Sequence, residues 1–201
     1  MVKWEIIPAK TALLVVDMNN NFLEKGAILE IPPARKVIPS LKNLIKVCRD
    51  MKIPVIYITQ CFKRDGSDVG IKRLMFGANY PPKGDVEMDG TRGVEIYDEI
   101  RPMKKDVFIK KSGYSSFHNT ALESILRKNG VDTLLITGVV SDCCVVATAI
   151  DAFQHDFKAV VISDCTAARD EKTQEMILKT ISRVFGEVAS SSDIIERLRK
   201  T

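Results

Sequence analysis

Short apolar runs that alternate with longer amphipathic segments constrain the fold of this chain most. ALLVVDM (12–18) and PVIYITQ (54–60) are continuous apolar runs, as expected for strands buried on both faces. The other expected strands share this character or are shorter, and they are DVFIKK (106–111), TLLITGVV (133–140), AVVISD (159–164) and a last strand near 186–190. Strands that alternate with helices predict a mostly parallel sheet of about six strands with helices on both faces.

The intervening segments have helical periodicity. The first, over about residues 37–48, places apolar side chains three and four positions apart, at Val37, Ile38, Leu41, Leu44, Ile45 and Cys48. Further helices are expected at about 120–130, 142–156 and 170–183. The segment SDIIERLRK predicts a terminal helix with Ser192 or Asp193 as its N-cap. The whole pattern indicates a three-layer αβα, Rossmann-like fold.

One segment interrupts the alternation. Residues 61–104 are rich in glycine, proline and charge, and they are too numerous for a plain connector. We expect short helices there and a role as a lid or subunit contact. Since 201 residues suit one domain and no linker is evident, residues 1–201 are interpreted as a single domain with this insertion.

Composition and charge restrict the function classes. The formal net charge is +4, from 30 basic and 26 acidic residues with mixed signs, so nucleic-acid and membrane binding have no support. No apolar run approaches the ~18 residues of a membrane span, and no signal peptide is evident, so a cytoplasmic protein is expected. Five cysteines without a CxxC pair indicate reduced thiols.

Three chemically reactive side chains follow three of the expected strands. Asp17 ends the first strand, Lys111 ends the third, and Cys143 and Cys144 follow the fourth. In open parallel sheets, ligands bind outside the carboxyl ends of the strands, so these groups are expected to meet. Each alone has an ordinary structural interpretation: a helix-capping carboxylate, a solvated lysine, a small apolar thiol. Burying Asp and Lys there unpaired would be costly, which favours a shared site.

The expected position of the thiol suggests nucleophilic chemistry. A cysteine in the first turn of a helix faces free backbone N–H groups and the positive end of the dipole, which lowers its pKa. A nearby lysine would lower it further. An aspartate can accept the thiol proton and return it to a leaving group, while backbone N–H groups hold an oxyanion. These parts together predict acyl transfer through a thioester, although core packing and a redox pair remain alternatives for the two cysteines.

Three ordered motifs resemble those of the isochorismatase-like cysteine hydrolases, a family that includes nicotinamidases and N-carbamoylsarcosine amidases. The matching segments are ALLVVDMNNNF, KSGYSSFHNTAL and GVVSDCCVVATAIDA, and the resemblance spans about residues 11–190. It implies Asp17 as the acid, Lys111 as the catalytic lysine and Cys144 as the nucleophile. Cys143 is then a packing residue, and a disulfide between the two neighbours is the redox alternative.

The resemblance also implies details of the site. It implies a cis peptide bond between Val139 and Val140, which directs the amides of Val140 and Cys144 toward the oxyanion. Arg169 resembles an arginine that meets a substrate carboxylate in N-carbamoylsarcosine-type members, and an exposed arginine is the alternative. Asn19 and three aromatic side chains are further candidates for substrate contact, namely Phe22, Tyr114 and Phe117.

Departures from the family motifs limit these implications. Asn19 replaces the usual Gln and Asn21 the usual Asp of the first motif. Zinc-binding nicotinamidases carry an Asp-x-His and a further His between the second and third strands, whereas residues 54–104 contain no histidine. The two histidines, His118 and His155, lack metal-ligand spacing. We therefore predict no catalytic metal and no cofactor.

The resulting prediction is a cysteine-dependent amidohydrolase that acts on a small non-peptide amide or N-carbamoyl compound and releases ammonia. Isochorismatase-type cleavage of a vinyl ether, which needs no thiol, is one alternative, and a nicotinamidase without zinc is another. A redox or binding protein that uses Cys143 and Cys144 is a different class. A dinucleotide-binding domain is disfavoured because no GxGxxG or P-loop follows a strand. The resemblance also implies a homo-oligomer, a dimer or tetramer.

Overall fold

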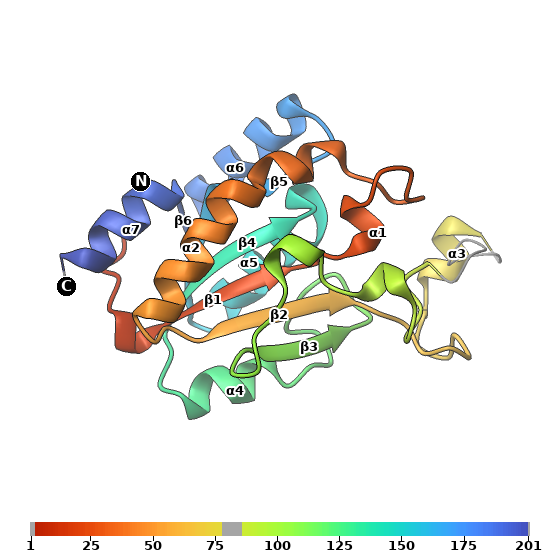
Figure 1. Ribbon diagram of the computed structural model, residues 1–201, viewed down its shortest axis with the longest axis horizontal. Helices are drawn as coiled ribbons and strands as arrows, with labels where there is room; N and C mark the ends of the chain where they lie inside the picture. Colours follow the sequence, from red (N-terminus) through yellow and green to blue (C-terminus); the bar gives the residue numbers. More distant parts are fainter. Residues whose placement is uncertain (1–2, 78–85, 201) are drawn as a thin grey trace.

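A computed structural model describes residues 3–77 and 86–200 and shows one six-stranded sheet between two layers of helices (Figure 1). Every strand pairing is parallel, and the order across the sheet is β3-β2-β1-β4-β5-β6. The strands are β1 (Thr11–Val16), β2 (Val55–Gln60), β3 (Val107–Lys111), β4 (Thr133–Val139), β5 (Lys158–Ala167) and β6 (Glu187–Ala189). The predicted three-layer α/β fold is confirmed.

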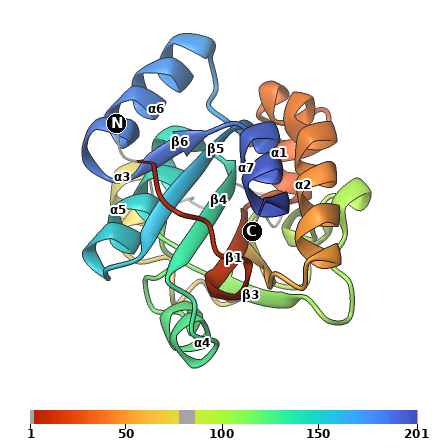
Figure 2. The ribbon, with the colours of Figure 1, turned by 90° about the vertical axis from the view of Figure 1, so that its left-hand side faces the viewer.

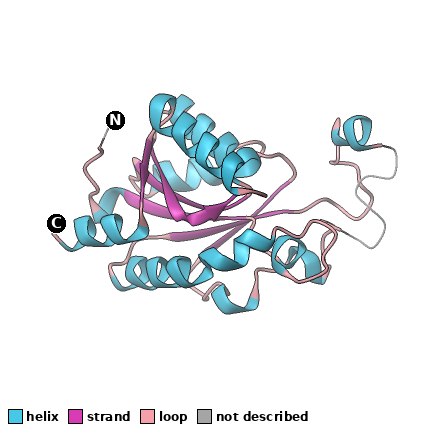
Figure 3. Ribbon diagram, turned by 90° about the horizontal axis from the view of Figure 1, so that it is seen from above, coloured by secondary structure: helices cyan, strands magenta, loops and turns pink. Residues whose placement is uncertain are grey.

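Helices cover both faces of the sheet (Figures 2 and 3). One layer contains α2 (Ile38–Asp50) and α7 (Ser191–Arg199). The opposite layer contains α4 (Leu122–Lys128), α5 (Val146–Gln154) and α6 (Glu171–Val184). The short helices are α1 (Asn20–Leu23), α3 (Lys72–Phe76), a π-helical turn (Ser141–Val145) and 3₁₀ turns at Pro8–Lys10, Pro32–Val37, Arg92–Val94 and Asp98–Ile100.

Strand β1 shows why the apolar runs are continuous. Its residues are all buried, and they alternate between two hydrophobic clusters. Leu13 and Val15 join the cluster under α2 and α7, whereas Leu14 and Val16 join the cluster under α4, α5 and α6. A strand with helices on both sides must be apolar at every position, since successive side chains point to opposite faces.

The chain changes direction across the sheet beside β1. Strands β2 and β3 extend to one side of it, and β4, β5 and β6 extend to the other. This reversal of strand order is the place where open α/β sheets bind ligands, outside the carboxyl ends of the strands. Figure 1 shows α3 beyond that end of the sheet, while both termini lie at the opposite end.

Gly138 permits the close approach of β4 to β1. It pairs with Val16, has φ +107°, and a Cβ atom at this position would lie 1.9 Å from the Val16 carbonyl oxygen. Both the backbone conformation and the contact therefore require glycine.

The structure differs from the sequence prediction in several boundaries. Ser190 caps α7, because its hydroxyl accepts a hydrogen bond from the Asp193 amide, so the expectation of Ser192 or Asp193 was wrong. Strand β5 extends to Ala167, three residues beyond the predicted end. The 61–104 insertion contains short helices, as expected, and its residues 78–85 lie outside the described part.

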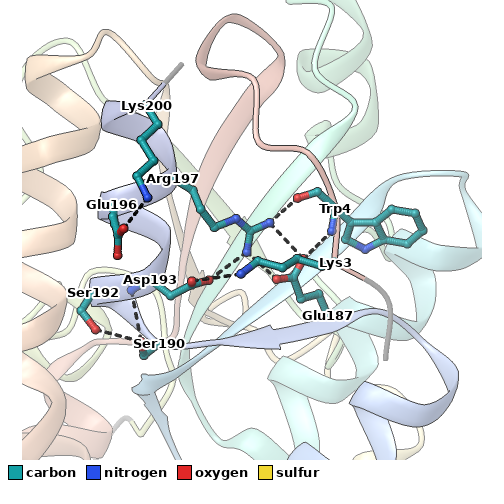
Figure 4. Close-up of polar contacts among 9 residues, drawn as sticks. All are labelled: Lys3, Trp4, Glu187, Ser190, Ser192, Asp193, Glu196, Arg197 and Lys200. Atoms are coloured by element: carbon teal, nitrogen blue, oxygen red, sulfur yellow. Dashed lines mark hydrogen bonds and ion pairs between the residues drawn. The ribbon is translucent and has the colours of Figure 1, made fainter.

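The N-terminal segment is fastened to α7 by a polar cluster (Figure 4). The Glu187 carboxylate accepts a hydrogen bond from the Trp4 amide, 2.7 Å away, and pairs with the Arg197 guanidinium. Arg197 also donates to the Trp4 carbonyl oxygen. The cluster joins the N-terminal segment to α7 near the two termini, at the end of the sheet opposite α3 (Figure 1), which indicates a structural role.

In the described part of the chain, no helix has the length and apolar character needed to cross a membrane.

Candidate active site

Three strands bring the three predicted catalytic side chains to one edge of the sheet. Asp17 directly follows β1 and turns sharply out of it, with φ 52° and its amide bonded to the Ile58 carbonyl. Lys111 is the last residue of β3. Cys144 lies in the π-helical turn that follows β4. The three groups come together as expected, although Cys144 occupies a π-helical turn rather than the start of an α-helix.

The Lys111 ammonium is the centre of the cluster. Its Nζ lies 2.8 Å from Asp17 Oδ2 and 3.4 Å from Cys144 Sγ. It also donates to the Gly113 carbonyl oxygen, 3.1 Å away. All three side chains are buried, and Cys144 retains 5% of its surface. A buried cation that contacts both a carboxylate and a sulfur can stabilise a thiolate and keep the carboxylate in place.

Gln60, at the end of β2, connects Asp17 with Lys111 and was not predicted from the sequence. Its backbone amide donates to Asp17 Oδ1 (2.5 Å), and its side-chain oxygen accepts from Lys111 Nζ (3.2 Å). Its side-chain nitrogen donates to the Ser112 carbonyl oxygen (2.9 Å). Strand β2 lies between β1 and β3, so its last residue necessarily sits between theirs. Gln60 could have been predicted as a site residue only from the order of the strands across the sheet.

The electrostatics of the site differ from the expectation for the thiol. Burial lowers the pKa of Lys111, but the charges of Asp17 and Cys144 outweigh it and raise the pKa above its ordinary value. The contact with Cys143 and burial raise the pKa of the Cys144 thiol well above its usual value, although Lys111 opposes this. The expected lowering was therefore wrong, because the contact with Cys143 and burial together outweigh the opposing charge of Lys111.

The backbone before Cys143 and Cys144 has an unusual conformation. The peptide bond between Val139 and Val140 is cis, which is the bond that the sequence motifs indicated. The Val140 carbonyl oxygen then accepts hydrogen bonds from the amides of Cys143 and Val145, at 3.0 and 3.2 Å. These bonds hold the turn that presents Cys144.

The candidate substrate-contact residues are divided between core, cleft and surface. Phe117 is buried in the same hydrophobic cluster as Cys144 and stacks on His155, with ring centroids 5.3 Å apart, and its contact with substrate stays a prediction. Phe22 and Asn19 are buried beside β1, and Asn19 donates to the Thr59 hydroxyl (2.7 Å). Arg169 is exposed and forms no hydrogen bond or ion pair with the described residues. Its contact with a substrate carboxylate stays a prediction.

Tyr114 lies in an open cleft next to the cluster of Asp17, Lys111 and Cys144. The cleft has a volume of about 710 Å³ and is lined by Lys72, Met75, Gly113, Tyr114 and Ile150, among others. Tyr114 is 38% exposed, and partial burial raises its pKa, as do the charges of Cys143 and Cys144. Lys72 comes from the insertion and was not singled out from the sequence, because an isolated lysine in a charged segment is ordinary.

All five cysteines are free thiols. Cys143 is half-buried and packs against both hydrophobic clusters. Among residues 3–77 and 86–200, no three His, Cys, Asp or Glu side chains are grouped so as to hold a metal ion. His155 instead faces the Glu123 carboxylate, with Nδ1 3.1 Å from Oε2.

Comparison with known sequences gives a family match over most of the chain. A family model described as "Isochorismatase domain" matches residues 11–193. A probable inactive nicotinamidase of Arabidopsis thaliana is 36% identical over 162 residues, covering 79% of this chain and 81% of the relative. The ureidoacrylate amidohydrolase RutB of Agrobacterium fabrum is 27% identical, covering 92% of this chain and 89% of the relative.

Solved structures agree with this match. A cysteine hydrolase from Pseudomonas syringae pv. phaseolicola 1448A has a TM-score of 0.94 and 30% identity, covering 99% of this chain and 97% of that one. The N-carbamoylsarcosine amidase of Thermoplasma acidophilum has a TM-score of 0.77 and 33% identity, covering 90% and 96%. With its sheet, its sequence and its three converging strand ends in agreement, this chain belongs to the isochorismatase domain family and is a hydrolase of that family.

Proposed function

We propose that this hydrolase cleaves a small non-peptide amide or N-carbamoyl compound, with Cys144 as the nucleophile and ammonia as the leaving group. The observation that carries the proposal is the position of Lys111 Nζ, which contacts both Asp17 Oδ2 (2.8 Å) and Cys144 Sγ (3.4 Å). A lysine buried between a carboxylate and a thiol suits activation of that thiol.

The chemistry begins with a protonated thiol, since the pKa of Cys144 is raised by Cys143 and burial. Asp17 accepts the thiol proton as the sulfur attacks the carbonyl carbon, and Lys111 stabilises the developing thiolate. The backbone amides of Val140 and Cys144 hold the oxyanion in this proposal. The C–N bond then breaks, Asp17 returns the proton to the leaving nitrogen, and ammonia departs.

A thioester remains on Cys144 after ammonia has left (a thiocarbamate if the substrate is an N-carbamoyl compound). Water attacks it, Asp17 accepts a proton from that water, and the C–S bond breaks. The proton returns to the sulfur, so the free thiol and the acid product are formed. Atoms balance over the two steps as amide plus water giving acid plus ammonia.

The relatives support amide chemistry over vinyl ether cleavage. The Agrobacterium relative is named for an amidohydrolase of ureidoacrylate, and the Thermoplasma structure for an amidase of N-carbamoylsarcosine. The Arabidopsis relative is named as inactive, so turnover by this chain must itself be measured. Isochorismatase-type cleavage is the second candidate, because the matching family model carries that name.

The test is ammonia release from a panel of nicotinamide, N-carbamoyl amino acids, ureido compounds and biuret. We expect release from at least one compound, and loss of that activity in Cys144→Ala. Cys48→Ala is the matched control, because it removes another buried thiol, in α2, and should leave turnover intact. Turnover by Cys144→Ala at the wild-type rate would refute the mechanism. Pyruvate release from isochorismate without ammonia release would favour the second candidate.

The predicted absence of a metal and the predicted oligomer remain proposals. Activity that survives dialysis against a chelator would agree with the absence of a catalytic metal. Sedimentation equilibrium would show whether the protein is a dimer or tetramer. A reversible loss of two hydrogens under air, seen by mass spectrometry, would instead support a redox role for Cys143 and Cys144.

A further inference from the structure

Lys72 is a buried lysine that the proposed chemistry does not use. It is the first residue of α3, in the 61–104 insertion, and is 7% exposed. Its Nζ donates to the Ser112 carbonyl oxygen, 2.9 Å away, one residue after Lys111. It also lies 4.5 Å from the ring centroid of Tyr114 and 4.8 Å from that of Phe62.

The Lys72 ammonium has hydrogen-bond donors that remain available to an anion. An ammonium has three donors, and the Ser112 carbonyl is the only acceptor within hydrogen-bond distance among the described residues. The two aromatic faces stabilise the charge without accepting a full hydrogen bond. A buried cation with incomplete hydrogen bonding gains strongly from an incoming carboxylate.

Lys72 lies in the wall of the cleft, close to the loop that contacts Lys111. Lys72 lines the open cleft together with Tyr114 and Gly113, and Gly113 holds Lys111. Burial lowers the pKa of Lys72 and Lys111 adds to this shift, whereas the charges of Glu87, Cys144 and Asp17 oppose it.

Other charged groups near the cleft are less suited to bind an anion. The carboxylates Asp68 and Asp151 line it but are half-buried, and the Asp68 carboxylate accepts a hydrogen bond from the Lys63 amide. Among the described residues lining the cleft, Lys72 is the one lysine or arginine. Arg169, the cation first considered for a substrate carboxylate, is exposed.

We propose that Lys72 is a specificity-determining residue that binds a carboxylate on the substrate, so that the enzyme selects ureido or N-carbamoyl acids over neutral amides. This inference rests on the proposed function, because it assigns the substrate class of the same site. The carbamoyl end would meet Cys144 and the carboxylate end would meet the Lys72 ammonium. Tyr114 would lie beside the chain that joins them.

The experiment measures binding, so that it does not depend on turnover. The probes are 3-ureidopropionate and N-propylurea, which share the ureido group and differ in having a carboxylate or a methyl group at the far end. Their dissociation constants are measured by calorimetry on Cys144→Ala, alone and combined with Lys72→Gln or Lys72→Arg. Glutamine keeps a donor for the Ser112 carbonyl but removes the charge, whereas arginine keeps the charge.

Lys72→Gln should weaken binding of 3-ureidopropionate by about 10- to 100-fold, the usual range for a charge-assisted hydrogen bond. It should change binding of N-propylurea less than 3-fold, and Lys72→Arg should retain most of the preference for the acid. Equal weakening of both probes would overturn the proposal and show that Lys72 only positions the Ser112 loop. The absence of any preference for the acid in the parent protein would also overturn it. Failure of the proposed function is recognised separately, by the absence of ammonia release from the whole panel.

Discussion

The Lys111 ammonium lies 2.8 Å from Asp17 Oδ2, and both side chains are fully buried. Each charge is therefore compensated mainly by the other. Burial alone lowers the pKa of Lys111, and the Asp17 carboxylate reverses that shift. Stability and activity should consequently both depend on the pair, but in different ways.

Asp17→Asn and Lys111→Met should each lower the free energy of unfolding by about 3–5 kcal/mol, because each leaves an uncompensated buried charge. The double variant should be less destabilised than the sum of the single variants, since both charges are then absent. All three variants should lack turnover. Urea unfolding followed by circular dichroism measures the energies, and additive values would contradict the coupling.

Cys143→Ala should make Cys144 more acidic. The contact with Cys143 is the largest cause that raises the pKa of Cys144, so removing it lowers that pKa. Alkylation by iodoacetamide requires the thiolate, and its midpoint should therefore shift to lower pH. Peptide mass spectrometry identifies the alkylated residue, and Cys48→Ala serves as a control that should leave the midpoint in place. An unchanged midpoint in Cys143→Ala would show that the contact does not control the thiol.

Gly138→Ala should disturb the site through the sheet. The new Cβ would lie 1.9 Å from the Val16 carbonyl oxygen, so β4 must move away from β1. We expect a loss of stability above about 3 kcal/mol, and lower turnover because Asp17 and Cys144 follow these two strands. Gly130→Ala is the matched control, since Gly130 has φ +65° but no atom within 4 Å of the added Cβ. Gly130→Ala should lower the free energy of unfolding by about 1 kcal/mol and leave activity unchanged. Equal effects of the two substitutions in thermal unfolding would refute the close-contact argument.

Tyr57→Phe should flatten the alkaline decline in stability. Burial raises the pKa of Tyr57 from 10.0 to about 12. A group whose pKa is raised in the folded state contributes its full stability below the unfolded pKa and loses it as pH rises through the folded pKa. The titration of Tyr57 should thus lower the free energy of unfolding by about 2 kcal/mol between about pH 10 and pH 12. Urea unfolding at pH 9, 10, 11 and 12 should show a shallower decline for Tyr57→Phe than for the wild type, and parallel declines would contradict the assignment.

Much of the fold followed from local pattern. Strands β1 and β2 are fully buried, as their unbroken apolar sequences indicate, and the periodic residues of α2 face one cluster. The boundaries were less predictable. Ser190 rather than Ser192 or Asp193 caps α7, because several adjacent residues can cap a helix and the preceding strand decides where the turn begins.

The roles of individual side chains were harder to predict from the sequence than the positions of the strands. Phe117 is buried and stacks on the half-exposed His155, and Arg169 is exposed, which their loop positions did not indicate. Gln60 contacts Lys111, and Lys72 contacts the loop that follows Lys111, yet nothing in the sequence around either residue distinguishes it. Lys72 and Ser112 are 40 positions apart, and Gln60 and Lys111 are 51 positions apart. Contacts over such separations cannot be predicted from the spacing of residues in the sequence.

Local composition is enough to predict the layered sheet and the arrival of an acid, an amine and a thiol at strand ends, because burial on both faces and parallel direction depend on it. The distances between those groups, the link that Gln60 forms between two of them and the raised pKa of the thiol became evident from the three-dimensional structure alone. The physical reason is that desolvation and hydrogen bonding depend on every neighbour in space, and the order of strands across the sheet sets those neighbours.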